Sequence, residues 1–315
     1  MSIELELKFL LATADSNQLP GLLGACGTIT DSGPAALLNA YYDTPDNWFR
    51  RHNMGLRTRL KNGRFEQTIK LAGQHHGALQ ARPEFNVPAT DIVPELAAFP
   101  SEIWPADTDV QALQQKLTEI FRTDFIRHSW QLACEDSVLE VVYDCGEVIA
   151  GRKTELIAEL ELELVSGNVN PLFHVADQLI TKLPLRTGWL SKAARGYLLA
   201  DKQQLNMPLA QQQGLMANLT ALQTVEALYY RQSAAIQAQT SQLPLMTSAS
   251  HYLQALSKEL TALQYHSHSA QAEALAGQLQ QGVIVFEQSL YNHFLLALTM
   301  LLVQQNGVAT GQEKS

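Results

Sequence analysis

The sequence has few cysteines and no long run of apolar residues. The 315-residue chain contains three cysteines, an odd number, and none is spaced as a CxxC pair. Neither a disulfide framework nor a structural zinc site is therefore expected. No stretch approaches the roughly 20 consecutive apolar residues that a membrane span requires, and the first residues carry three charges, on Glu4, Glu6 and Lys8. We predict a cytoplasmic protein with no membrane partner.

Basic residues are scarce as well. Lys and Arg number 22 against 31 Asp and Glu, which gives a formal net charge of -9. Because nucleic-acid backbones are bound mainly by a surplus of Lys and Arg, no nucleic-acid partner is expected. An acidic protein can still bind phosphate where its basic residues are gathered at one site. The placement of the Lys and Arg side chains therefore decides which function the sequence supports.

The chain changes character shortly after residue 200. Residues 1–202 contain strand-like segments separated by turn signals, whereas residues 208–307 are rich in Gln, Ala and Leu, with apolar residues recurring every three or four positions. A polar segment that contains Pro208 separates them. The sequence therefore predicts an α+β protein with a larger strand domain and a smaller all-α C-terminal domain. We expect the helical domain to pack on the first domain or to pair with a second copy in a homodimer.

Several expected strands alternate between apolar and charged residues. Residues 3–9 place two glutamates and one lysine on one face and four apolar side chains on the other. Asn62-Gly63 lies between two strand-like runs and predicts a β-hairpin over residues 55–71, whose two-residue turn fixes the register. In this register, basic side chains from both strands share one face: Arg57, Arg59 and Lys70. Like charges this close require anions opposite them, from the protein or from a ligand.

A later strand, residues 154–165, carries a row of carboxylates. Glu159, Glu161 and Glu163 share one face, with Cβ atoms about 6.6 Å apart, twice the rise per strand residue. Neighbours at this distance can share a bound divalent cation. Other expected strands contribute further charged side chains: Arg82, Glu84, Arg127 and Asp144.

So many amphipathic strands form either a one-sided sheet or a closed sheet with the charged faces inward, and closure also removes open edges. A charged lumen would supply what phosphoryl transfer requires. Arg and Lys clamp phosphate oxygens, and carboxylates hold Mg²⁺ or Mn²⁺, which prefer oxygen ligands. The pattern therefore favours a metal-dependent phosphohydrolase over an ordinary solvated sheet face.

These residues also resemble a known family. Glu4-x-Glu6-x-Lys8 matches the ExExK signature of the CYTH superfamily, also called triphosphate tunnel metalloenzymes. The resemblance covers about residues 1–200 and is strongest to bacterial inorganic triphosphatases that carry a CYTH domain followed by a CHAD domain. Further matching segments are 41–46, 56–59, 68–70, 82–84, 159–163 and 191–197, together with Asp144.

The resemblance implies an eight-stranded antiparallel β-barrel tunnel with flanking helices. It implies that the substrate is bound by Lys8, Arg57, Arg59, Lys70, Arg82, Arg127 and Lys192. It implies that Mg²⁺ or Mn²⁺ is bound by Glu4, Glu6, Asp144, Glu159, Glu161 and Glu163. The catalytic residues that it implies are Lys70, Tyr42 and Glu6. A two-metal route is favoured because the final strand offers three glutamates.

The expected reaction is hydrolysis of inorganic triphosphate, or of a short polyphosphate, to pyrophosphate and phosphate. Three alternatives come from the same superfamily: thiamine triphosphatase, nucleoside triphosphatase and class IV adenylate cyclase. A fourth, of another class, is a polyphosphate-binding module without turnover. Residues 208–307 resemble a truncated or diverged CHAD domain, and because only four basic residues accompany six acidic ones from residue 201 onward, this part is not expected to bind a polyanion strongly.

Overall fold

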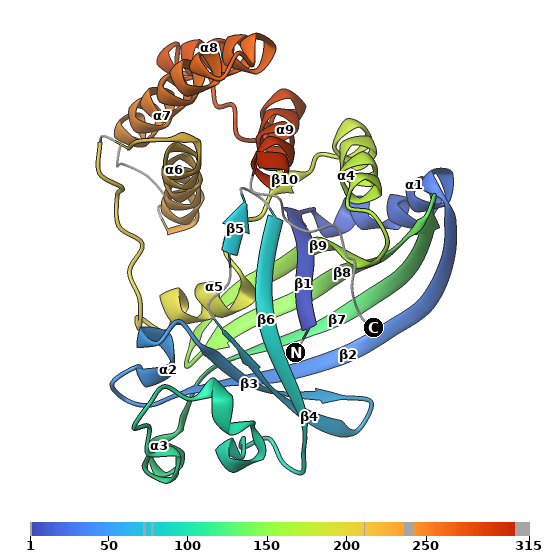
Figure 1. Ribbon diagram of the computed structural model, residues 1–315, viewed down its shortest axis with the longest axis vertical. Coiled ribbons are helices and arrows are strands. Elements are labelled where there is room, and N and C mark those ends of the chain that lie inside the picture. Colours follow the sequence, from blue (N-terminus) through green and yellow to red (C-terminus); the bar gives the residue numbers. More distant parts are fainter. Residues whose placement is uncertain (1, 72–73, 77–78, 211, 236–241, 306–315) are drawn as a thin grey trace.

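The computed structural model describes residues 2–71, 74–76, 79–210, 212–235 and 242–305. The strands are β1 (Ser2–Leu10), β2 (Thr28–Asp43), β3 (Gly55–Lys61), β4 (Arg64–Lys70), β5 (Gln74–His76), β6 (Leu79–Ala89), β7 (Thr118–Cys134), β8 (Ser137–Ala150), β9 (Lys153–Ser166) and β10 (Arg186–Thr187). The α-helices are α1 (Leu19–Cys26), α2 (Trp48–Arg51), α3 (Val110–Lys116), α4 (Asn170–Lys182), α5 (Lys192–Leu199), α6 (Leu215–Ala235), α7 (Leu243–Ala262), α8 (His266–Gln280) and α9 (Ser289–Gln305). The chain is thus α+β, with one large antiparallel sheet and a helical C-terminal region (Figure 1).

The sheet corrects the expectation of an eight-stranded barrel. It has ten strands, in the order β10-β1-β9-β8-β7-β2-β3-β4-β6-β5, and this order ends on two short strands. In addition, β1 pairs with β6 as well as with β9. The two extra strands, β5 and β10, have three and two residues. They form backbone hydrogen bonds with the neighbouring long strands. Segments of two or three residues are too short to show the alternation by which a strand is predicted from sequence.

The predicted hairpin is confirmed. Asn62 and Gly63 have φ values of 51° and 74°, the left-handed conformations that a type I′ turn demands. Arg57 lies opposite Thr68, and Arg59 lies opposite Glu66. The register therefore places the basic side chains of β3 and β4 on one face, as the sequence indicates.

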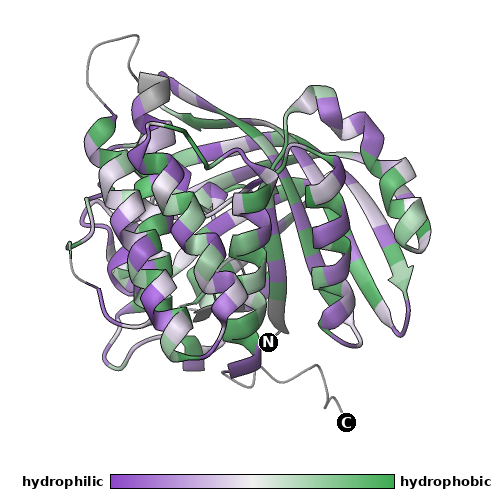
Figure 2. Cartoon of the chain, turned by 90° about the horizontal axis from the view of Figure 1, so that it is seen from above, coloured by the Kyte–Doolittle hydropathy of each residue, from purple (hydrophilic) through white to green (hydrophobic). Residues whose placement is uncertain are grey.

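On adjacent long strands, the charged residues lie directly opposite one another. Lys8 lies opposite Glu161, Glu6 lies opposite Glu163, and Asp144 lies opposite Glu159. Hydrophilic and hydrophobic bands follow one another along the strands (Figure 2). One face of the sheet is consequently charged, whereas the other packs into apolar cores.

Helices cover the apolar face. One core joins β1, β7, β8 and β9 to α1 and α4, and it includes Leu296 and Val303 of α9. A second core lies among α6, α7, α8 and α9, which stand together at the top of Figure 1. The helical region therefore packs on the sheet through α9, while its division into a separate domain over residues 208–307 stays a prediction. Among the described residues, the helices fall short of the length and apolarity that a membrane crossing requires.

The short helix α5 lies very close to the sheet. A Cβ placed on Gly196 would lie 2.1 Å from two ring carbons of Phe121, which is 2% exposed on β7. No real Cβ contact is that short, so the helix approaches the sheet only because residue 196 has no side chain. This approach brings Lys192 and Arg195, on the same helix, against the charged face of β9.

A buried carboxyl group lies among the C-terminal helices. Glu226 of α6 is 2% exposed, and its Oε2 accepts hydrogen bonds from Trp189 Nε1 and from the Tyr291 hydroxyl, both at 2.9 Å. Burial raises the pKa of Glu226 to about 7, against the lowering effect of these two donors and of Arg186. The folded protein therefore holds this proton at a higher pH than the unfolded chain does.

We expect Gly196→Ala to lower the free energy of unfolding by about 1–3 kcal/mol, because overpacking forces the α5–β7 contact apart. The matched control is Gly277→Ala in α8, where no heavy atom lies within 4 Å of the added Cβ. That change should leave stability equal or raise it by about 0.5–1 kcal/mol, since Ala is the better helix former. Urea unfolding of both variants measures the difference, and a Gly196→Ala protein as stable as the parent would refute the close approach.

We expect the stability contributed at Glu226 to be fully present below pH 4.5 and to be lost as the pH rises through about 7, because its folded pKa lies above its unfolded value. Glu226→Gln keeps an oxygen acceptor and removes the charge. It should therefore be more stable than the parent by on the order of 3 kcal/mol at pH 8, with the advantage shrinking towards pH 5. Urea midpoints from pH 5 to 8 measure this, and a difference independent of pH would contradict it.

Candidate active site

A cavity of about 340 Å³ lies against the charged face of the sheet, within the roughly 300–1,000 Å³ range of small-molecule sites. Its basic lining residues are Lys8, Arg57, Arg59, Lys61, Lys70, Arg127 and Lys192. Its acidic lining residues are Glu6, Glu66, Glu84, Glu140, Glu161 and Glu163. Charged side chains from seven strands and from the start of α5 therefore converge on one space.

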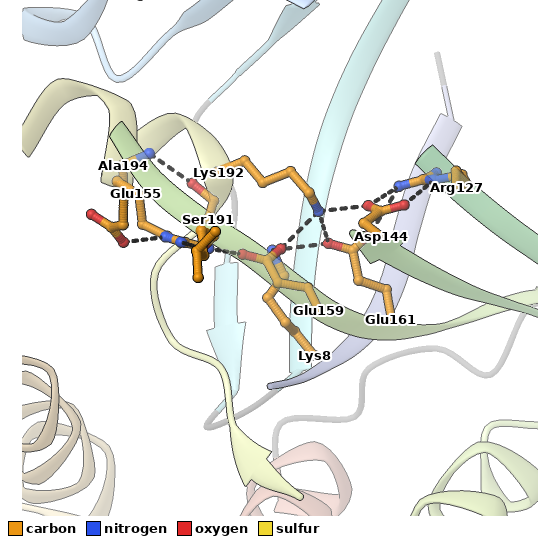
Figure 3. A network of polar contacts seen from close by, with 11 residues as sticks. Lys8, Arg127, Asp144, Glu155, Glu159, Glu161, Ser191, Lys192 and Ala194 are labelled. Atoms are coloured by element: carbon orange, nitrogen blue, oxygen red, sulfur yellow. Dashed lines mark hydrogen bonds and ion pairs between the residues drawn. The ribbon is translucent and has the colours of Figure 1, made fainter. Parts of the chain in front are cut away.

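Lys192 is the centre of the ionic contacts on one wall (Figure 3). Its Nζ lies 2.7 Å from Asp144 Oδ2, 2.7 Å from Glu159 Oε2 and 3.0 Å from Glu161 Oε1. Burial alone would lower the pKa of Lys192, but these three carboxylates raise it well above its usual range. A lysine at the first turn of a helix opposes the helix dipole, so the carboxylates of β8 and β9 are what hold its charge in place.

Glu161 receives three cations at once. Lys8 Nζ lies 3.0 Å from Glu161 Oε1, and Arg127 Nη2 lies 3.2 Å from Glu161 Oε2, in addition to Lys192. Arg127 also binds both oxygens of Asp144 at 2.7 Å. Burial would raise the pKa of Glu161, yet Lys192, Lys8 and Arg127 bring it well below its ordinary value. Glu161 is thus ionised and remains at the cavity wall.

Two of the predicted metal ligands lie deeper than the cavity wall. Asp144 and Glu159 are fully buried. Glu159 forms ion pairs with Lys8, Lys192 and Arg195. Although burial opposes it, these cations lower the pKa of Glu159. In this arrangement both carboxylates neutralise buried cations and so fix the positions of the lysine and arginine side chains above them.

The carboxylates at the cavity wall fit a hard cation by their chemistry. Glu6, Glu163 and Glu140 are direct neighbours on β1, β9 and β8, and Glu161 follows Glu163 on the same face. Like charges directly opposite one another repel, and oxygen ligands suit Mg²⁺ and Mn²⁺. In the described part of the chain, no group of three or more Asp, Glu, His or Cys side chains lies close enough together to hold a metal ion. The carboxylates that could bind a cation therefore lie on adjacent strands, but their oxygens do not meet at one point.

The opposite wall carries cations from the β3–β4 hairpin. Glu84 partly balances them, at 2.6 Å from Lys70 Nζ and 3.6 Å from Arg57 Nη2. Arg59 has a neutral partner, Asn39 Oδ1 at 2.8 Å, and within the described ranges no carboxylate forms an ion pair with it. Burial, followed by the charges of Arg57 and Arg127, lowers the pKa of Arg59 to about 9. At Arg59 the surroundings therefore oppose the positive charge more than they stabilise it.

The structure places Tyr42, the predicted catalytic tyrosine, outside the cavity. Its side chain lies in the apolar core with Phe49 and Leu56, on the face of the sheet away from the cavity. Tyr41 lines the cavity instead. Burial would raise the pKa of Tyr41, but Arg57, Arg59 and Lys192 lower it. Two consecutive tyrosines look alike in sequence, and the irregular pairing of β2 with β7 between them makes strand parity a poor guide here.

The remaining predicted site residues are placed as follows. Lys8, Arg57, Arg59, Lys70, Arg127, Lys192, Glu6, Glu161 and Glu163 come together at the cavity. The backbones of Glu4 and Arg82 pair with each other across β1 and β6, but their side chains lie outside the described part of the structure. Sequence reasoning missed Tyr41, Asn39 and Glu140 as site residues. The parity shared by Glu140 and Asp144 on β8 was the one signal that could have identified Glu140.

A second, open cavity of about 520 Å³ lies at the tip of the hairpin. It is lined by Arg59, Lys61, Asn62, Arg64 and Glu66. Three of these residues also line the first cavity. The basic surface therefore continues along β3 and β4 from the first cavity to the tip of the hairpin.

Comparison with known proteins places this geometry in context. Over 200 residues the chain is 36% identical to an inorganic triphosphatase from Haemophilus influenzae, an alignment that covers 64% of this chain and 56% of the relative. The chain therefore spans little more than half the length of that protein.

Solved structures also match. A putative adenylyl cyclase from Hippeastrum, described as having a dominant triphosphatase activity, is 15% identical with a TM-score of 0.45, and the match covers 62% of this chain and 95% of that one. A putative adenylate cyclase from Bacillus halodurans is 22% identical with a TM-score of 0.38, covering 57% and 89% of the two chains.

A family model matches the chain over the full extent of the described sheet. Residues 2–197, from the start of β1 into α5, match the model of the CYTH domain. This range contains all the strands and all the charged residues that line the cavity. The chain belongs to the CYTH domain family.

Proposed function

We propose that this protein hydrolyses inorganic triphosphate to pyrophosphate and phosphate, with Mg²⁺ or Mn²⁺, in the cavity at the charged face of the sheet. The observation that carries the proposal is the arrangement of charge: cations from β3 and β4 face a cavity whose other wall presents carboxylates from β1, β8 and β9. A linear polyanion fits the first wall, and a divalent cation fits the second. Family membership and the 36% identity to an inorganic triphosphatase support the same reaction.

The substrate would lie along the basic wall. Arg57 and Arg59 from β3 and Lys70 from β4 would bind phosphate oxygens, and Lys8 and Arg127 would bind them from the facing strands. A phosphate group beside Arg59 would supply the negative charge that its surroundings lack. Part of the binding free energy therefore comes from relieving repulsion that exists before the substrate arrives. Tyr41 is placed to donate a hydrogen bond to the bound anion.

Metal would be held by the carboxylates at the wall. Glu6, Glu161 and Glu163 would hold it with Glu140, and Glu4 stays a sequence-based candidate. When bound, such a cation supplies a Lewis acid for phosphoryl oxygens and lowers the pKa of bound water. In this proposal Asp144 and Glu159 keep Lys192, Lys8 and Arg127 in place rather than bind metal. In the proposed reaction the oxygen of a water molecule bonds to the terminal phosphorus while the bond from that phosphorus to the bridging oxygen breaks. Pyrophosphate leaves, phosphate is formed, and the protons of the water pass to the products or to solvent.

The remaining parts of the proposal concern the setting of the site. We propose that the pairing of β1 with both β9 and β6 encloses the cavity as a tunnel, and that residues 1–202 and 208–307 are two domains. A cytoplasmic location, the absence of a nucleic-acid partner and a homodimer formed through the helical region stay predictions. Hydrolysis rates for tripolyphosphate, ATP and thiamine triphosphate compared side by side distinguish the inorganic substrate from the organic alternatives.

We expect Glu161→Gln to lower kcat for tripolyphosphate by at least about 100-fold, because it removes a metal ligand and leaves three cations less balanced. Arg57→Ala should chiefly raise KM, by about 10- to 100-fold, the effect of one lost charged hydrogen bond. Phosphate release with Mg²⁺, with Mn²⁺ and with EDTA measures both. The control is Arg122→Ala, which removes an exposed arginine paired with Glu119. Full activity in both site variants would refute the site.

We expect tripolyphosphate to raise the melting temperature in the presence of EDTA, because the basic wall binds the anion without metal. At 100 times Kd the stabilisation should be about 2.7 kcal/mol. Arg59→Gln should lose most of this shift yet be at least as stable as the parent without ligand, since the folded state lowers the pKa of Arg59 and therefore disfavours its charge. An unchanged shift in Arg59→Gln, measured by thermal denaturation, would contradict anion binding at this wall.

A further inference from the structure

The short segment between β10 and α5 controls two lysines of the cavity. Gly188 N donates a hydrogen bond to Lys8 O at 2.9 Å, and a Cβ on Gly188 would lie 2.8 Å from Lys8 Cγ. Three residues further on, Ser191 caps α5 by accepting a hydrogen bond from Ala194 N at 3.1 Å. Lys192 follows immediately, so a shift of this segment moves Lys192 and displaces Lys8.

The C-terminal helices hold the start of this segment. Asn292 of α9 is fully buried, and its Oδ1 accepts two hydrogen bonds from Thr187, from N at 2.8 Å and from Oγ1 at 2.9 Å. Its Nδ2 donates to backbone oxygens of Phe286 and Gln288. Asn292 is therefore fixed from both ends and transmits the position of α9 to Thr187.

The same helices hold the middle of the segment. Glu226 of α6 accepts the indole hydrogen of Trp189 at 2.9 Å, and the hydroxyl of Tyr291 on α9 donates to the same oxygen. One buried acceptor thus joins both helices to the segment. The indole cannot rotate away without leaving a buried carboxyl oxygen short of a donor.

A third contact reaches the ion-pair network itself. Arg231 of α6 lies 3.1 Å from Glu155 Oε2, and Glu155 Oε1 lies 2.6 Å from Arg195 Nε. Arg195 in turn pairs with Glu159. Glu159 pairs with Lys192 (Figure 3). A continuous line of hydrogen bonds and ion pairs therefore runs from α6 to the cavity lysine.

We infer that α6 and α9 act as a positioning element of the site: Glu226, Asn292 and Arg231 hold the segment from Thr187 to Arg195 so that Lys8 and Lys192 meet the substrate in the right place. The inference rests on the proposed function. The helical region is then required for turnover although none of its described residues lines the cavity. Glu226 is a positioning residue, because it acts through Trp189 and not on the substrate.

Glu226→Leu tests the inference in the full chain with tripolyphosphate and Mg²⁺. Removing the acceptor should lower kcat by about 10- to 100-fold, the cost of displacing a catalytic group by roughly 1 Å, measured well below the melting temperature. Glu226→Gln should restore kcat to within about twofold, because its Oε1 can accept both hydrogen bonds. Rescue by Gln separates the acceptor function from any need for the charge.

Ser269→Ala is the matched control. Ser269 is buried in α8 and bonds to Ser257 and Thr261, so its loss destabilises the helical region without touching the segment from Thr187 to Arg195. It should lower the melting temperature and leave kcat unchanged. A fall in kcat with Ser269→Ala as large as with Glu226→Leu, or full kcat in Glu226→Leu, would overturn the inference.

Two further measurements keep the outcomes distinct. If Glu226→Leu does not fold, Trp189→Phe, which removes the indole donor and keeps an aromatic ring, should lower kcat in the same direction, whereas full kcat in it counts against the inference. If the parent protein does not hydrolyse tripolyphosphate, the proposed function fails by itself. The thermal shift by tripolyphosphate in EDTA then decides the inference. Glu226→Leu displaces Lys8 and Lys192 but leaves the β3–β4 wall in place, so its shift should be smaller than that of the parent, whereas Ser269→Ala should keep the full shift. An undiminished shift in Glu226→Leu would overturn the inference.

Discussion

The contact of Lys192 with Asp144, Glu159 and Glu161 is the interaction on which the site depends. Charges at this depth are costly unless each has partners. Lys8, Arg127 and Arg195 supply further partners, so the carboxylates stay ionised and the cations stay protonated. Removing one member leaves the others buried without compensation, which ties the geometry of the cavity wall to the stability of the sheet.

The two walls differ in how well their charges are balanced. On the side of β8, β9 and α5, buried carboxylates match the cations. On the side of β3 and β4, Arg59 has a lowered pKa because burial and neighbouring arginines oppose its charge. An anion bound beside Arg59 would offset its repulsion from the neighbouring arginines. This difference between the walls, more than the total charge of the chain, is what supports the proposed binding of a polyphosphate in the cavity.

The helical region adds a structural requirement that its composition does not suggest. It carries little positive charge and packs through α9 on the apolar face of the sheet. Its buried polar residues Glu226 and Asn292 reach the segment that precedes α5. Because a polar group buried in a helical core lowers stability unless it is bonded, its presence there indicates a specific partner. Both partners, Thr187 and Trp189, lie in the segment that leads to Lys192.

The sequence by itself determined the alternation of charge and the register of the hairpin, because strand period and the Asn62-Gly63 turn are local properties. It therefore identified Arg57, Arg59, Lys70 and the glutamates of β9 as sharing one face. Only the tertiary structure decided depth and pairing: it buried Glu159 and Asp144 under cations, placed Tyr41 rather than Tyr42 at the cavity, and added β5 and β10 to the sheet. These outcomes depend on contacts between segments far apart in the chain, such as Arg195 with Glu159 and Trp189 with Glu226, which no local pattern encodes.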